Sequence, residues 1–243
     1  MGKAMLLGVA AVAMAAGGCG QSHAEDGGPT VQRNYQVGGF DKIEVAGPYD
    51  VMVRTGNAPS VSASGPQKAI EEMVVEVKGD KLVIHARERH GGIFSWGSHN
   101  FGTTTLQVTV PALSAAMIAG SGGISVDKVA GDNFDGGVAG SGDLNLESLA
   151  VKSVKLSIGG SGDIKAKSGQ AVQAEYHIAG SGDIDARGLR SEVAQAVIAG
   201  SGSIRAEATG TAEAKIMGSG DITLTGGAKC TISKMGSGDV NCS

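Results

Sequence analysis

The residues with the most regular chemistry in this chain are aspartates that follow a recurring Gly-Ser-Gly phrase. Carboxylates stacked at a fixed interval could bind Ca²⁺. Calcium-binding Gly- and Asp-rich repeats are nonapeptides with one residue between Gly and Asp, whereas here Asp follows Gly directly and two copies carry Gly123 or Ser203 instead. We therefore expect a structural role, in which each Asp accepts hydrogen bonds from the backbone of its own corner. These aspartates are Asp143, Asp163, Asp183, Asp221 and Asp239.

A second group of candidate residues lies in the segment "HARERHGGIFSWGSHNF", residues 85–101. Its histidines, His85, His90 and His99, lack the close spacing typical of metal ligands, so we expect no metal site. Two hypotheses remain for the apolar part: it covers the first turn of the fold as part of a cap, or it contacts a partner or a membrane. The candidate interaction residues are Ile93, Phe94, Trp96 and Phe101.

The third group is a cysteine pair close to the C-terminus. Cys230 and Cys242 lie six residues before and six residues after the first Gly of the last Gly-Ser-Gly, Gly236. This symmetry favours a disulfide that closes the final turn, stabilising the fold by about 2–3 kcal/mol, over two buried free thiols. Lys234, in an otherwise apolar column, also indicates an end.

Catalytic signatures are absent from the sequence. A glycan-degrading β-helix needs paired carboxylates and aromatic platforms for sugar rings, but aromatic residues make up only 3% of the chain. No Ser-His-Asp order, phosphate-binding loop or nucleophile elbow is present. We therefore predict no catalytic residue, no metal and no cofactor. The net charge of −4 and the lack of a basic stripe argue against nucleic-acid binding.

An internal repeat must position these side chains. Gly-Ser-Gly begins at residues 120, 140, 160, 180, 200, 218 and 236, so the repeat has 18–20 residues. Apolar residues occupy even offsets from that first Gly, and polar residues mostly occupy odd offsets, as in strands with one buried face. Copies this similar must stack on one another. Residues 114–243 are therefore predicted to form a right-handed parallel β-helix, or a closely related β-solenoid, of about seven turns.

Residues 39–113 are predicted to form a β-rich N-terminal part that covers the first turn, because a bare solenoid end is an exposed strand edge. Strands are expected around the Gly-Pro corner of "FDKIEVAGPYDVMVRTG", in a hairpin turning at Gly79-Asp80, and in "TTTLQVTVP". "QKAIEEM" indicates a helical turn. Residues 19–38 are polar and Gly-rich, which is typical of a tether.

Residues 1–18 have the pattern of an export signal: Lys3, a short apolar run, and small residues before Cys19. "AAGGC" is similar to the bacterial lipobox, which predicts lipidation of Cys19, although Ala16 stands where Leu is usual. Cleavage after Ala24 is the alternative and would release a soluble exported protein.

"FDKIEVAGPYDVMVRTG", then "KGDKLVI", then serial "AGSGDI" phrases resemble the bacterial putative auto-transporter adhesin head GIN domain family (DUF2807) over residues 39–240. The resemblance implies an exported, envelope-associated β-helical domain and supplies no catalytic residues. We expect a non-catalytic adhesion-like scaffold, either an outer-membrane lipoprotein or a protein of the periplasm or cell surface. It would bind an envelope protein or surface ligand, and self-association is compatible with the pattern. An envelope-sensing or regulatory binding domain is the alternative, and a glycan-active enzyme comes third.

Overall fold

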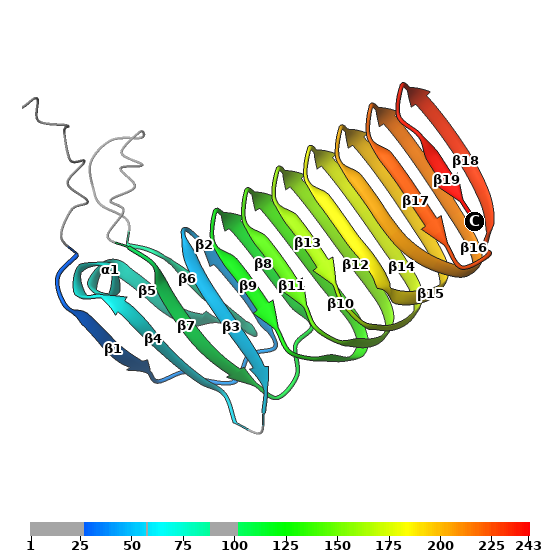
Figure 1. The fold of residues 1–243 in the computed structure, drawn as a ribbon. Helices are drawn as coiled ribbons and strands as arrows, with labels where there is room; N and C mark the ends of the chain where they lie inside the picture. Colours follow the sequence, from blue (N-terminus) through cyan, green and yellow to red (C-terminus); the bar gives the residue numbers. More distant parts are fainter. Residues whose placement is uncertain (1–26, 57, 88–101) are drawn as a thin grey trace, which may run out of the picture.

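Strands wind around one axis through almost the whole described chain, each turn lying on the one before it (Figure 1). The computed structural model describes residues 27–56, 58–87 and 102–243. Within these ranges the sheet has 19 strands, and the helix α1 (Gln67–Glu72) has six residues. No helix of the described ranges is long and apolar enough to cross a membrane. The predicted β-solenoid is confirmed.

Each repeat contributes strands to two faces that meet at the Gly-Ser-Gly corner. The face that leads into the corners, here called the leading face, is a parallel ladder of β8 (Ala115–Gly120), β10 (Val129–Gly140), β12 (Leu149–Gly160), β14 (Gly169–Gly180) and β18 (Lys229–Gly236). The trailing face, which follows the corners, contains β9 (Gly123–Val126), β11 (Asp143–Leu146), β13 (Asp163–Ala166), β17 (Asp221–Thr225) and β19 (Val240–Cys242). β15 (Asp183–Gly200) and β16 (Ser203–Gly218) start on the trailing face and end on the leading face.

The connection opposite the corner is more regular than the loose turn that the sequence predicts. Val129 pairs with Leu149, and Leu149 pairs with Gly169 of the next turn, before the chain bends into the leading face. Val151 and Val154 are both buried although they lie three residues apart, so the inward parity changes at this bend. Each turn therefore has a short third side.

Seven corners enclose six intervals, and residues 120–236 accordingly wind about six turns. The expected number of about seven turns is one too high, because the last corner begins no further complete turn. The predicted inward columns are confirmed. Four residues after the first corner Gly, one column is almost fully buried; it comprises Ile124, Leu144, Ile164, Ile184, Ile204 and Ile222.

Large and small side chains alternate along the narrow core. Tyr176 is fully buried beside Ala174 and is stacked on Ala196 of the next turn. Gly136 has a similar role, since a Cβ there would collide with the side chains of Leu144 and Leu156. These pairs keep the cross-section constant although the repeats are not identical.

The N-terminal part continues the solenoid instead of only covering it. β2 (Lys42–Ala46) and β3 (Tyr49–Thr55) pair in parallel with β8 and β9, which places Ala46-Gly47-Pro48-Tyr49-Asp50 in register with the first Ala-Gly-Ser-Gly-Gly corner. β6 (Lys81–Ala86) and β7 (Thr104–Val110) add an outer turn in the same direction.

Antiparallel strands then close this end. β5 (Met73–Lys78) forms the predicted hairpin with β6, and β4 (Ser60–Pro66) pairs with β7. β1 (Thr30–Tyr35) pairs with the outer edge of β4, and α1 connects β4 to β5 with Ile70 buried. The parallel solenoid thus ends in a short antiparallel cover, at the blue and cyan end of Figure 1.

Candidate functional site

The corner ridge is built by backbone contacts between turns. The first Gly of each corner has a positive φ, for example 131° at Gly140. The third position needs Gly for another reason: a Cβ on Gly142 would overlap the carbonyl oxygen of Gly122 in the preceding turn. Ser141 and Gly142 both donate their N–H groups to the carbonyl oxygen of Gly120, at 2.9 and 3.0 Å.

The aspartates that follow the corners form a ladder whose hydrogen bonds join successive turns. Asp143 Oδ1 accepts the N–H of Asp163 at 3.3 Å, and Asp163 Oδ1 accepts the N–H of Asp183 at 3.2 Å. In the next turn, Asp183 Oδ1 accepts the N–H of Ser203 at 2.8 Å. The same contact joins Asp221 Oδ1 to the N–H of Asp239 at 3.0 Å.

This corrects the expected partner, since we predicted that each Asp bonds to its own corner. The corner's own amides are already used, because they donate to the turn before. The carboxylate therefore bonds to the turn after it. Across the described ranges, no group of three or more His, Cys, Asp or Glu residues is placed to hold a metal ion.

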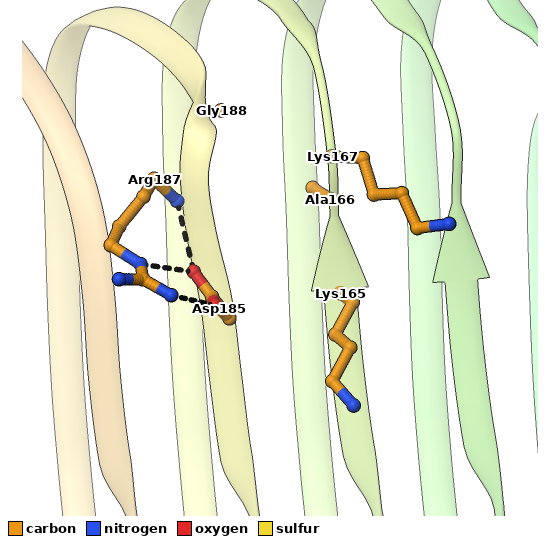
Figure 2. Close-up of a pocket in the computed structure, with 6 residues that line it drawn as sticks. All are labelled: Lys165, Ala166, Lys167, Asp185, Arg187 and Gly188. Atoms are coloured by element: carbon orange, nitrogen blue, oxygen red, sulfur yellow. Dashed lines mark hydrogen bonds and ion pairs between the residues drawn. The ribbon is translucent and has the colours of Figure 1, made fainter.

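A shallow hollow of about 370 Å³ lies on the trailing face, lined by Lys165, Ala166, Lys167, Asp185, Arg187 and Gly188 (Figure 2). Arg187 binds Asp185 with two N–H groups, at 2.8 and 2.6 Å, and lowers the pKa of that carboxyl group. Lys167 extends to the opposite side of the hollow, where it pairs with Glu147.

The hollow lies where the length of the repeat changes. The register between β15 and β16 shifts between Ala186 and Arg190, where a turn of 20 residues is followed by one of 18. Leu146 pairs with Ala166, but the next ladder ends at the pair Lys165–Asp185, so the sheet opens here. The lining residues include no thiol, hydroxyl or imidazole, and two of its three cations are paired with carboxylates.

The predicted interaction segment begins and ends beside α1. Ile93, Phe94, Trp96 and Phe101 lie outside the described residues, as do His90 and His99, but the chain enters the segment after β6 and leaves it before β7. The N–H of Arg87 donates to the carbonyl oxygen of Glu72 at 2.7 Å, at the end of α1. Gly102 lies against Pro66, just before α1. The segment therefore connects β6 to β7, the two strands of the outer turn.

The same helix also contacts the beginning of the described chain. The carbonyl oxygen of Gly27 accepts the N–H of Lys68 at 3.1 Å, and that of Pro29 accepts the N–H of Gln67 at 3.0 Å. Cys19, the predicted lipidation site, precedes this contact and lies outside the described residues. Gly27, Pro29 and the two residues that flank the inserted segment, Arg87 and Gly102, thus all lie beside α1 at one end of the solenoid.

The remaining predicted residues lie at other places. His85, on β6, lies between the carbonyl oxygen of Ala86 (2.8 Å) and Glu76 (3.1 Å). Cys230 on β18 and Cys242 on β19 form a disulfide with Cα atoms 6.6 Å apart. The structure thus groups the predicted residues into a corner ridge and two ends.

Comparison with known proteins supports this arrangement of strands. A putative adhesin from Bacteroides fragilis has a TM-score of 0.79 at 24% identity, with 88% of this chain and 97% of that chain covered. A putative lipid binding protein from Parabacteroides distasonis has a TM-score of 0.68 at 24% identity (89% and 97% covered). A putative adhesin from the same species has a TM-score of 0.70 at 22% identity (89% and 98% covered). These identities establish a shared fold. No curated protein matches the chain significantly.

A family model matches residues 39–228, which include β2–β17, all but β1 of the N-terminal closure and all corners but the last. The match begins just before β2 and covers most of the chain. By this match the chain belongs to the family described as "Putative auto-transporter adhesin, head GIN domain".

Proposed function

We propose that this protein is an exported, non-catalytic scaffold of the cell envelope, anchored through a lipid on Cys19, that holds its sheet faces and C-terminal end toward a partner at the cell surface. The observation that carries the proposal is the position of the tether. It meets the solenoid at α1, on the opposite end from β18 and β19.

This position limits the distance between the fold and a membrane. Gly27 follows Cys19 by eight positions in the sequence. An extended chain spans at most about 3.3–3.6 Å per residue, so α1 would lie within roughly 29 Å of the lipid anchor. The solenoid turns would then extend away from the membrane, which suits adhesion. The family description and the adhesins of the same fold also support this role.

The inserted segment that contains Trp96 is the proposed second contact at the anchored end. It leaves the fold beside the tether, so an anchored chain would carry its aromatic residues close to the bilayer. A contact with lipid is also compatible with the fold shared with a protein described as lipid-binding. We prefer this role to that of a cap, because the described strands β1, β4 and β5 already cover the outer turn.

The anchor is tested by palmitate labelling of the wild-type chain and of Cys19→Ser, followed by separation of membranes from soluble envelope proteins. We expect label and membrane association in the wild type and neither in the variant. An unlabelled wild type that fractionates as soluble would contradict the anchor.

The segment is tested with a Phe94→Ser/Trp96→Ser double variant of the lipid-free chain. Unchanged unfolding with lost binding to vesicles or intact cells supports the contact role. A loss of folding stability supports the cap instead. Met52→Ser, an exposed apolar position elsewhere on the surface, is the matched control.

A further inference from the structure

The C-terminal turn is closed in a way that no other described turn shares. β18 pairs only with β16, and β19 pairs only with β17, so both strands leave one edge unpaired. The inward side chains of this turn are poorly covered. Ile232 is 50% exposed, whereas Ala214, its partner in the preceding turn, is fully buried.

Without the last turn, β16 would present an edge that favours pairing with another chain. β16 has 16 residues, and its inward side chains at this end, Ala212, Ala214 and Ile216, are apolar and buried. A long edge with an apolar inner side is a template for pairing with another chain. Within this solenoid, that edge already stacks on a turn of the same sequence type, so the complementary molecule is a second copy of this chain.

β18 has the opposite properties. It pairs residue for residue with residues 211–218 of β16, but Lys234 stands at the inward position that Ile216 occupies one turn earlier. The Nζ atom of Lys234 lies 3.4 Å from Asp239 Oδ1 in the same turn. An inward-pointing charge on an edge strand is a device that prevents edge-to-edge association. The last turn therefore covers the edge of β16, which favours pairing with another chain, and exposes the edge of β18, which does not.

The cover has few buried side chains to hold it, and the disulfide supplies a covalent tie. Cys230 lies on the leading face and Cys242 on the trailing face, so their bond closes the last turn across its two faces. Cys230 and Cys242 are themselves only partly buried. Backbone contacts such as Ser237 N–H to the Gly218 carbonyl oxygen, at 2.9 Å, provide the rest.

We propose that the last turn, residues 229–243, is a disulfide-latched plug that keeps a second copy of this chain from pairing with the β16 and β17 edges. In the reduced state the plug opens and the chain associates through these edges. Opening takes two electrons and two protons from a dithiol, which is oxidised to its own disulfide while Cys230 and Cys242 become thiols. The inference does not depend on the adhesion role or on the lipid anchor.

Hydrogen exchange followed by mass spectrometry tests the latch in the full-length chain carrying Cys19→Ser, so that no third thiol is present. On adding a dithiol, peptides from residues 229–243 should exchange roughly 100-fold faster, the factor expected for opening a disulfide loop of this size. Peptides from β12 and β14 should not change. Equal exchange of residues 229–243 before and after reduction would overturn the latch.

Association is measured on the same samples by sedimentation equilibrium. The oxidised protein should stay monomeric over the concentration range, and the reduced protein should show concentration-dependent dimers. A Cys230→Ser/Cys242→Ser variant should behave like the reduced protein and should not respond to the dithiol. A reduced protein that opens its last turn yet stays monomeric would overturn the proposed pairing.

Lys234→Ile separates the charge from the latch. In the oxidised protein, whose last turn stays in place, it should produce concentration-dependent dimers through the β18 edge, because the inward charge that opposes pairing is removed. Lys155→Ile is the matched control, an exposed lysine on β12 away from the end. Equal effects of the two substitutions would overturn the role of Lys234.

Discussion

The two ends of this solenoid meet the same physical difficulty in different ways. At the N-terminal end, antiparallel strands and α1 cover the outer turn, and Ile70 and Met73 are buried there. At the C-terminal end no further strand of the described chain follows, and the inward side chain of Ile232 is 50% exposed. The comparison teaches that a solenoid edge can be removed by covering it, or left open and made unsuitable for pairing.

The corner of the N-terminal turn differs from the later corners for a related reason. A Cβ at the third corner position points toward the preceding turn, as the overlap of Gly142 with Gly122 indicates. The turn of β2 and β3 has no Gly-Ser-Gly corner before it, since the sequence between β6 and β7, residues 87–103, contains no Gly-Ser-Gly. Tyr49 can therefore stand where later turns need Gly, and its ring lies over Gly47. Pro48, which lacks an N–H donor, is tolerated for the same reason.

The largest expected effect is on a corner with neighbours on both sides. Gly182→Ala should lower the free energy of unfolding by about 4 kcal/mol, because the new methyl group overlaps the carbonyl oxygen of Gly162. Tyr49→Phe, at the equivalent position of the N-terminal turn, should cost less than about 1 kcal/mol. Denaturant unfolding measures both. A tolerated Gly182→Ala would contradict the explanation of the corner glycines.

The second prediction applies one substitution to the two ends. Ile70→Ala at the covered end should cost about 3 kcal/mol, because it leaves a cavity under α1. Ile232→Ala at the open end should cost less than about 1 kcal/mol, since half of that side chain already contacts water. Equal losses in denaturant unfolding would show that the C-terminal end is covered in solution.

The third prediction concerns tyrosine ionisation in alkali. Burial raises the pKa of Tyr176 well above its usual range and also raises the pKa values of Tyr35 and Tyr49. The folded state thus favours the neutral phenol. This stabilisation is complete below the unfolded pKa of about 10 and is lost as the pH rises through the folded pKa.

Phenolate absorbance and circular dichroism should therefore change together above about pH 10. The chain has three tyrosines, all in the covered end or the middle, so the signal does not report on the open end. Tyr176→Phe should raise stability by about 1 kcal/mol, because the Tyr176 hydroxyl has no hydrogen-bond partner among the described residues. Complete ionisation of all three tyrosines in a protein with native dichroism would contradict the burial of Tyr176.

The smallest effect is expected for the aspartate ladder. Asp163→Ala removes the bond to the Asp183 amide and should cost about 0.5 kcal/mol. Asp239→Ala should cost less, since the Asp239 carboxylate accepts no backbone N–H from the described residues. A calcium chelator should leave the melting temperature of the wild type unchanged. A drop in melting temperature on chelation would instead indicate a metal bound along the ladder.

Sequence reasoning located the repeat because each turn must satisfy the same stacking constraints. Inward columns need branched apolar residues and corners need glycine, so these residue types recur along the chain at a fixed interval. The N-terminal turns are harder to recognise in the sequence as copies of the repeat, because Pro48 and Tyr49 replace the serine and glycine of the later corners. The equivalence of "AGPYDV" and "AGSGDI" becomes visible only in the pairing of β3 with β9.

The sequence by itself determined the solenoid, its period, its inward columns and the position of the end near Lys234, because these depend on side-chain periodicity along the chain. The tertiary structure decided which amide each Asp accepts, why Tyr49 is allowed at a corner, and that Gly27 and Pro29 contact α1 close to the residues that flank the inserted segment. These features depend on which turn lies beside which, and no local pattern in the chain specifies contacts between residues 18 or more positions apart.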